Sequence, residues 1–165
     1  MTARVTYDLA VEPVGTMYEA LVNFLGSTAS FVGFVIHRDS VHLTSEARNL
    51  LRSLEPYLVR LELVSEWPGT LMVGAHRYQH HVYRLHPDVV SRLLSLTTRL
   101  YEWENPELPD DLHFLRSDGS TMLGSIAHEE DGWLEFDDEE LAAFVRSVPS
   151  SLREILVPHA EDAEE

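Results

Sequence analysis

The chain has 165 residues and contains neither cysteine nor lysine; its twelve basic residues are all arginines. The lack of cysteine excludes disulfides, thiolate metal sites and cysteine nucleophiles. The lack of lysine excludes Schiff-base chemistry and the phosphate-binding loop Gly-x-x-x-x-Gly-Lys. The Gly-x-Ser-x-Gly and Gly-x-Gly-x-x-Gly patterns are missing as well. Catalysis would therefore depend on Asp, Glu and His side chains, which meet only in the folded chain.

Long apolar runs are also missing. The densest one, FVGFVI at 31–36, is far shorter than the roughly 18 residues that a membrane-spanning helix requires. The first 13 residues have no apolar core of the kind found in signal peptides, because Asp8 and Glu12 interrupt them. We therefore expect a soluble, cytoplasmic protein with no membrane partner. The length favours a single domain, which we place at residues 1–158, followed by a disordered acidic tail at 159–165.

Negative charge is abundant, and it is distributed unevenly. Residues 1–100 hold nine acids and nine arginines, whereas residues 101–165 hold nineteen acids and three arginines, so the later segment carries the whole net charge of −16. A field of this sign disfavours nucleic acid and anionic membranes. It favours a basic protein partner. No sequence feature calls for a cofactor, and the oligomeric state stays open.

Hydrophobic periodicity predicts a mixture of strands and helices in which hairpins dominate the strand pairs. This pattern is typical of an α+β fold with a mainly antiparallel sheet of about six strands, packed against a single layer of three to five helices. We expect strands at 3–11 and 31–38, a hairpin from 57–66 and 70–85, and a three-stranded meander over 111–136. We expect helices at 16–25, between Thr44 and Pro56, from Pro87 to about Trp103, and at 138–147, with one or two further turns at 150–156.

The ends of several elements carry recognisable signals. Thr16 is a candidate N-cap, and Gly26 is a candidate stop for the helix that Thr16 begins. Asp131-Gly132 supplies a turn that tolerates positive φ. Asp137 and Glu140 have the spacing of a capping box before the last long helix.

Histidines provide the candidate metal ligands. If the segment HRYQHH were a helix, His76 and His80 could share an ion. Turn residues and aromatics around it favour a strand instead, on which these two residues stand about 13 Å apart and His81 faces the opposite side. A metal site would therefore need ligands from other elements, and the alternative is that the histidines are polar residues on the outer face of the sheet. The candidate set is His76, His80, His113 and His128.

The segment GSIAHEEDGWLEFDDEE, at 124–140, is the most charged part of the chain. It has neither the alternating acids of an EF-hand nor the second histidine of the His-Glu-x-x-His zinc motif. Strand, loop, strand and capped helix account for its carboxylates. The pattern LPDDLHFLRSDG…LGSIAHEEDGWLEF, within residues 103–136, resembles small bacterial α+β proteins of the immunity-protein kind, which neutralise a toxin. The resemblance implies a toxin-like partner and carries no catalytic residue.

Our leading hypothesis is a non-catalytic, acidic protein-binding module of the immunity or antitoxin kind that occludes a basic partner. The alternatives are a small metal-dependent hydrolase or metal- or pH-responsive protein that uses the histidines, and a structural or assembly subunit. The leading hypothesis assigns no catalytic residue, no metal and no cofactor. Its predicted partner contacts are Asp110, Asp111, Glu129, Glu130, Asp131 and Trp133.

Overall fold

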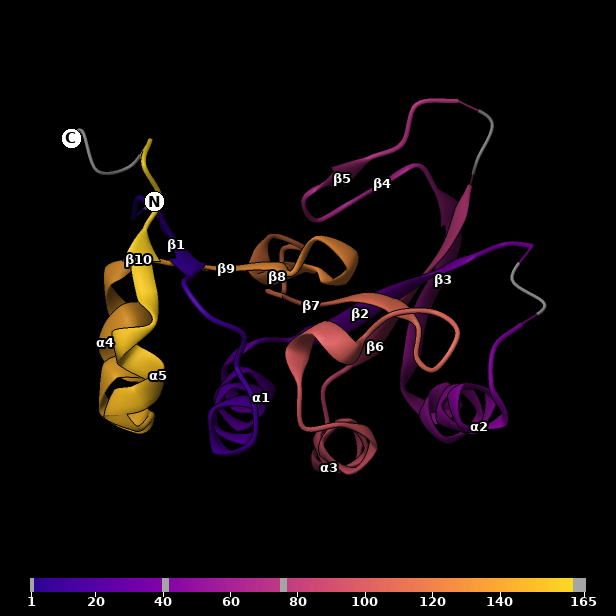
Figure 1. Ribbon diagram of the computed structural model, residues 1–165, viewed down its shortest axis with the longest axis horizontal. Coiled ribbons are helices and arrows are strands. Elements are labelled where there is room, and N and C mark those ends of the chain that lie inside the picture. The colour runs from indigo at the N-terminus through magenta and orange to yellow at the C-terminus, as the bar shows by residue number, and fades with distance from the viewer. Residues whose placement is uncertain (1, 40–41, 75–76, 162–165) are drawn as a thin grey trace.

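The computed structural model describes residues 2–39, 42–74 and 77–161, and they form an antiparallel sheet covered by helices on one face (Figure 1). Each pair of neighbouring strands is antiparallel. Across the sheet the strands are β10 (Leu156–Pro158), β1 (Val5–Leu9), β9 (Asp131–Phe136), β8 (Thr121–Ile126), β7 (Asp110–Leu115), β2 (Phe31–His37), β6 (Tyr78–Arg84) and β3 (Leu58–Val64).

The predicted α+β class is confirmed, but the prediction of about six strands is wrong, because the sheet has eight. β10 was not foreseen. It is three residues long and ends in a proline, so it has no periodic signal of its own, and it pairs with β1 at the edge of the sheet. Two short strands, β4 (Glu66–Trp67) and β5 (Thr70–Leu71), form a separate hairpin.

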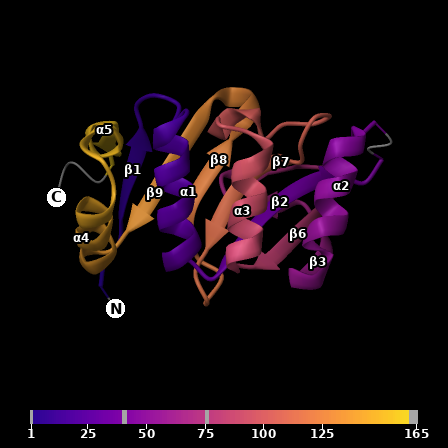
Figure 2. The same cartoon turned by 90° about the horizontal axis from the view of Figure 1, so that it is seen from below.

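Helices lie on one side of the sheet, as Figures 1 and 2 show from two directions. No helix in the described ranges is both long and apolar enough to cross a membrane. The α-helices are α1 (Thr16–Thr28), α2 (Ser45–Leu54), α3 (Pro87–Leu96), α4 (Asp138–Ser147) and α5 (Ser150–Glu154), and the 3-10 turns are η1 (Glu55–Tyr57), η2 (Leu100–Glu102) and η3 (Ala127–Glu129).

Two helix boundaries differ from the sequence prediction. α1 begins after Gly15 and runs through Gly26 to Thr28. Gly26 is therefore not a stop; a Cβ there would lie 2.4 Å from Cγ2 of Val90, so the glycine lets α1 pack closely against α3. α3 ends at Leu96, because the backbone of Thr97 is extended. The apolar residues that suggested a longer helix belong to η2 and the loop after it.

The predicted caps of α2 and α4 are confirmed. The Thr44 hydroxyl accepts the Ala47 N–H at the start of α2. The Asp137 carboxylate accepts the Glu140 N–H at 2.8 Å, and the Glu140 carboxylate accepts the Asp137 N–H at 2.9 Å. The sequence did not reveal that Glu140 also binds the buried Arg116 through both of its oxygens, each at 2.7 Å. This pair joins α4 to the end of β7.

The predicted meander is confirmed as β7, β8 and β9, but its second turn lies one residue earlier than expected. Glu130, with φ of 53°, is the left-handed residue, whereas Asp131 and Gly132 already belong to β9. Gly132 is needed for a different reason: a Cβ there would come within 3.0 Å of the Tyr101 hydroxyl.

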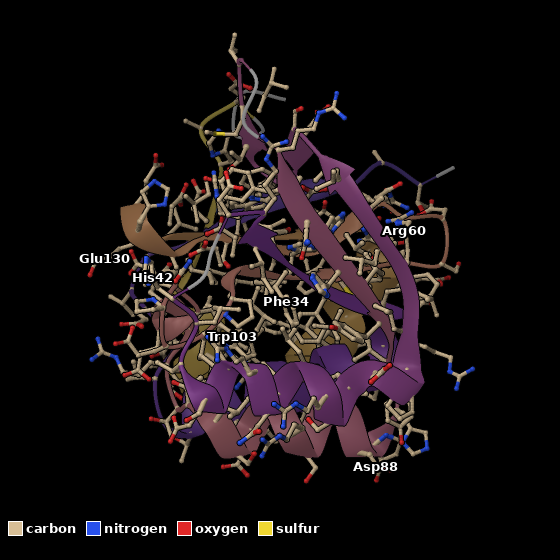
Figure 3. The ribbon with its side chains drawn as sticks, turned by 90° about the vertical axis from the view of Figure 1, so that its right-hand side faces the viewer. Phe34, His42, Arg60, Asp88, Trp103 and Glu130 are labelled. Carbon is tan, nitrogen blue, oxygen red and sulfur yellow. The ribbon has the colours of Figure 1, made fainter. Side chains whose placement is uncertain are left out.

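The core lies between the helices and the near face of the sheet. At one end Phe24, Phe136 and Phe144 pack with ring centroids 5.2–6.0 Å apart, joining α1, β9 and α4. Toward the other end the Trp103 ring stacks on Phe34, and its Nε1 donates to the Tyr18 hydroxyl at 3.1 Å. Figure 3 shows Phe34 and Trp103 between the sheet and α2.

The opposite face of the sheet has no layer of helices, and the β4–β5 hairpin folds over part of it (Figure 1). The Trp133 ring lies over this face, close to Gly124 and Gly69. A Cβ on Gly124 of β8 would come within 2.2 Å of that ring, and a Cβ on Gly69 of the hairpin turn within 2.3 Å. Two glycines therefore enclose one indole and hold the hairpin close to the sheet.

We predict that Gly124→Ala lowers the free energy of unfolding by about 1–3 kcal/mol, because the added methyl group forces the Trp133 ring to move. Urea denaturation would measure the change. Combining the substitution with Trp133→Leu should cost less than the sum of the two single changes, since the clash disappears with the ring. Additive losses would contradict this packing.

Candidate functional site

A pocket of about 310 Å³ lies under the β4–β5 hairpin, between it, the loop before β7 and η3. Aromatic rings and acids line it together. Trp67 and Tyr78 contribute two rings whose centroids are 4.7 Å apart. We call this the Asp111 pocket; its lining residues are Trp67, Thr70, Met72, Tyr78, Glu104, Asn105, Asp110, Asp111 and His128.

Asp111 holds the walls of this pocket together. Its side chain is only 4% exposed, and its Oδ2 accepts the Trp67 Nε1–H at 2.9 Å while its Oδ1 accepts the Ala127 N–H at 3.0 Å. Its backbone is left-handed, with φ of 60°. This conformation turns the side chain toward the hairpin and η3. Burial raises the pKa of the Asp111 carboxyl, and the two donated hydrogen bonds oppose that shift.

Asp110 is the less buried carboxylate of the pair. Its Oδ1 accepts the Asn105 N–H at 2.9 Å. Burial raises its pKa to about 6, and the neighbouring charges of Asp111 and Glu104 act in the same direction. Near neutral pH the pocket therefore holds a carboxylate that is ionised against the preference of its surroundings. A bound cation would relieve this cost, because an opposite charge favours the ionised form.

A second, larger groove adjoins the Asp111 pocket through the shared residue Glu104. It has a volume of about 470 Å³. Four carboxylates line it, and among the residues that the structure describes no arginine nitrogen lies within 4.0 Å of any of them. We call it the glutamate groove; its lining residues are Glu46, Leu96, Tyr101, Glu102, Glu104, Glu107 and Leu108.

The predicted contact residues divide into two groups. Asp110 and Asp111 line the pocket. Glu129, Glu130 and Asp131 follow one another along η3 and the start of β9, all exposed. Trp133 is half-buried between the two glycines described above, and its Nε1 donates to Glu135 at 3.1 Å. Glu130 also lines a small hollow of about 200 Å³ with Glu12 and Tyr101.

The predicted outer-face arrangement of the histidines is right for the face on which His80 lies, but His80 is buried there, and the prediction is wrong for His81. His80 of β6 and His113 of β7 are both buried and reach toward each other across β2, with 2.8 Å between their Nε2 atoms. Gly33 of β2 makes this possible, because a Cβ there would lie 2.5 Å from Nε2 of His113. His81 lies on the helix side, where its Nδ1 is 3.1 Å from the Tyr83 hydroxyl.

The hydrogen bonds fix the tautomers of the His80–His113 pair. Nδ1 of His113 lies 2.7 Å from the Asp111 carbonyl oxygen, which only accepts, so this nitrogen carries the proton. Nε2 of His113 therefore accepts the Nε2–H of His80. Burial lowers the pKa of His80 to about 4 and that of His113 to about 3. Both rings are neutral near pH 7, and both of the nitrogens that face each other are engaged.

Among residues 2–39, 42–74 and 77–161 no group of three or more His, Asp or Glu side chains is placed to hold a metal ion. His80 and His113 form a pair, whereas His128 is exposed at the Asp111 pocket and lies 3.6 Å from the Glu129 carboxylate. His76, the fourth candidate, lies outside the described residues.

Sequence reasoning missed Trp67, Tyr78 and Glu104 as parts of one site. They belong to the hairpin, to β6 and to the loop before β7, and they meet only because the hairpin folds back over the sheet. No pattern of residue spacing in the sequence predicts that the hairpin folds back in this way. No protein-family model matches the sequence, and the comparisons with curated proteins and with solved structures found no match either.

We predict that the protein loses stability steeply as the pH falls from about 6.5 to about 4. Burial lowers the pKa of His80, His81 and His113 from 6.5 to about 4, 4 and 3, so the unfolded chain takes up protons first and stability is lost over this range. Asp110, with its pKa raised from 3.8 to about 6, acts in the opposite direction. Near pH 5 these four groups leave the unfolded state with about two more bound protons, or about 2–3 kcal/mol per pH unit.

Urea denaturation at a series of pH values measures this slope. The variant His81→Phe keeps an aromatic ring beside Phe34 and removes one of the three titrations. Its slope near pH 5 should be smaller by about 1.2 kcal/mol per pH unit. A stability that stays level between pH 6.5 and 4.5 would contradict the neutral, buried state of the histidines.

Proposed function

We propose that this chain is a non-catalytic binding protein that captures a basic segment of a partner protein at the Asp111 pocket and the glutamate groove. The observation that carries the proposal is the composition of the pocket. Two aromatic rings stand beside a carboxylate whose raised pKa favours a bound cation, and a groove of carboxylates without arginine partners within the described residues continues from it.

An arginine side chain has the chemistry that such a pocket accepts. Its guanidinium stacks on aromatic faces and donates to carboxylates in a planar fork. Trp67 and Tyr78 offer the faces, and Asp110 offers the carboxylate. The glutamate groove would then receive further positive charges of the same segment, and the exposed Glu129, Glu130 and Asp131 would steer the encounter.

The state of the polar groups favours binding over catalysis. Both carboxylate oxygens of Asp111 accept hydrogen bonds from the protein itself. The His80–His113 pair is neutral and its facing nitrogens bond to each other, so neither of these two nitrogens is free to accept a proton from a substrate. The resemblance over residues 103–136 suggests that the partner is a toxin with a cationic active site, whose occlusion would neutralise it.

A labelled peptide with several arginines, and its counterpart with citrulline at the same positions, test the proposal directly. Citrulline keeps the shape of arginine and removes its charge. We expect the arginine peptide to bind at low salt, at least about tenfold more tightly than the citrulline peptide, and to weaken as salt screens the acids. Fluorescence anisotropy would measure both affinities. Equal affinities of the two peptides would overturn the proposal.

A matched pair of variants places the site. Glu104→Gln combined with Asp110→Asn removes two charges from the pocket and should weaken arginine-peptide binding about tenfold or more. Asp138→Asn combined with Glu139→Gln removes two charges from exposed positions of α4 and should leave binding within about threefold of the unmodified protein. Since the pKa of Asp110 is about 6, affinity should also fall as the pH drops below that value. Equal losses in the two variants would place the peptide elsewhere.

A further inference from the structure

The strand β3 is an exposed edge of the sheet. It is the last strand in the spatial order, and Figure 3 looks directly at it, with α2 beneath. Six of its seven residues are exposed, including large apolar ones: Val59, Leu61 and Leu63 are 50%, 50% and 49% exposed. Edge strands are normally short, charged or covered, because their free N–H and C=O groups invite another strand. A seven-residue apolar edge is therefore a surface that a partner strand fits.

The sequence of this strand identifies the partner. Residues 58–64 read LVRLELV, and their pattern of apolar and charged positions is symmetric about Leu61, with Arg60 on one side and Glu62 on the other. If a second copy pairs antiparallel with Leu61 opposite its own equivalent, Arg60 of each copy faces Glu62 of the other. Two pairs of opposite charges then flank a central pair of leucines. Opposite charges across antiparallel strands stabilise the pairing, and like charges destabilise it.

Neighbouring registers of the two strands are less stable, because they place like charges opposite each other. Paired residues of a continuous sheet must point to the same face, so the register can shift only in steps that keep this alternation. A two-fold axis at position 60 would place the two Arg60 side chains opposite each other. An axis at position 62 would do the same to the two Glu62 carboxylates. Charge therefore selects the register centred on Leu61.

The faces of the strand agree with this arrangement. Leu61 and Leu63 pair with His81 and Gln79 of β6, whose side of the sheet carries the helices. Arg60 and Glu62 point to the other face, where they form an exposed ion pair at 3.4 Å within the chain. Pairing two edges would cover the leucines beside α2 of each copy. The bulge between Leu58 and Arg60 affects only the outer end of the pairing.

We propose that two copies of this chain associate through β3 to form one continuous antiparallel sheet, centred on Leu61. The interface consists of β3 residues that do not line the Asp111 pocket, although the two surfaces adjoin, since Tyr78 of the pocket pairs with Val64 of β3. Residues 1–100, which supply the interface, have no net charge, and α4, α5 and β10 lie at the opposite edge of the sheet (Figure 2). The acids of α4 therefore repel those of the second copy only over a long distance, where salt screens the repulsion.

Charge exchange tests the pairing in solution. Sedimentation from low micromolar to submillimolar concentration should show a monomer–dimer equilibrium. Arg60→Glu turns both ion pairs into repulsive pairs and should raise the dimer dissociation constant about tenfold or more. Arg60→Glu combined with Glu62→Arg restores opposite charges and should return the constant to within about threefold. A monomer at every concentration, or equal weakening by the single and the double exchange, would overturn the proposal.

Cysteine substitution tests the register, because the chain has no cysteine of its own. In the proposed dimer the Leu61 positions face each other at disulfide distance, whereas the two Leu63 positions are about 13 Å apart. Leu61→Cys should therefore form a disulfide-linked dimer under mild oxidation, and Leu63→Cys should remain largely unlinked. Equal linking of the two variants, or preferential linking through position 63, would overturn this arrangement. Neither result depends on whether a basic partner binds.

Discussion

The hydrogen bonds of the Asp111 carboxylate hold together the face of the molecule that lies opposite the helices. One oxygen holds Trp67 of the β4–β5 hairpin and the other holds the first residue of η3. The main chain of the same residue donates to the Trp103 carbonyl and accepts from His113. The hairpin, η3 and the loop at Trp103 thus meet β7 at one buried residue. If Asp111 lost its charge or its left-handed backbone, the hairpin would lose the hydrogen bond that anchors it, and the pocket would lose a wall. The raised pKa of this group records the cost of burying it.

Glycines, which have no side chain, shape this face as much as the hydrogen bonds of Asp111 do. Gly33 leaves room for His113 to reach His80 across an intervening strand, and Gly124 leaves room for the Trp133 ring. Rings lying on the backbone therefore shield part of the sheet that no helix covers. This packing is sensitive to substitution of the glycines, because each ring occupies the space that the Cβ of a larger residue would need. It also explains why buried histidines occur on a face that sequence periodicity marks as outer: the face is closed by local packing and not by a second layer.

Local signals in the sequence predicted local structure well. The caps at Thr44 and Asp137 act through residues three positions away, so a short window contains the whole interaction. The boundaries that failed depend on distant neighbours. Gly26 continues a helix because Val90 packs against it, and β10 exists only because β1 is there to pair with it. The candidate site also depends on residues that are distant in sequence. Asp110 and Asp111 could be selected from their charge, but the rings beside them come from other elements.

The two proposed surfaces use the charge distribution of the chain in different ways. A strong net charge attracts a basic partner, but it also drives identical chains apart. Both kinds of contact can coexist if the acids and the self-association surface are separated in space. The sequence separates them by placing every excess acid after residue 100 and the strand LVRLELV before it. The fold keeps the acidic helix α4 at the edge opposite β3. The Asp111 pocket lies nearer, since its Tyr78 pairs with Val64, but none of its lining residues belongs to β3. In the proposed dimer, the strand pairing would join the neutral edges and leave an acidic pocket on each copy open to a basic segment.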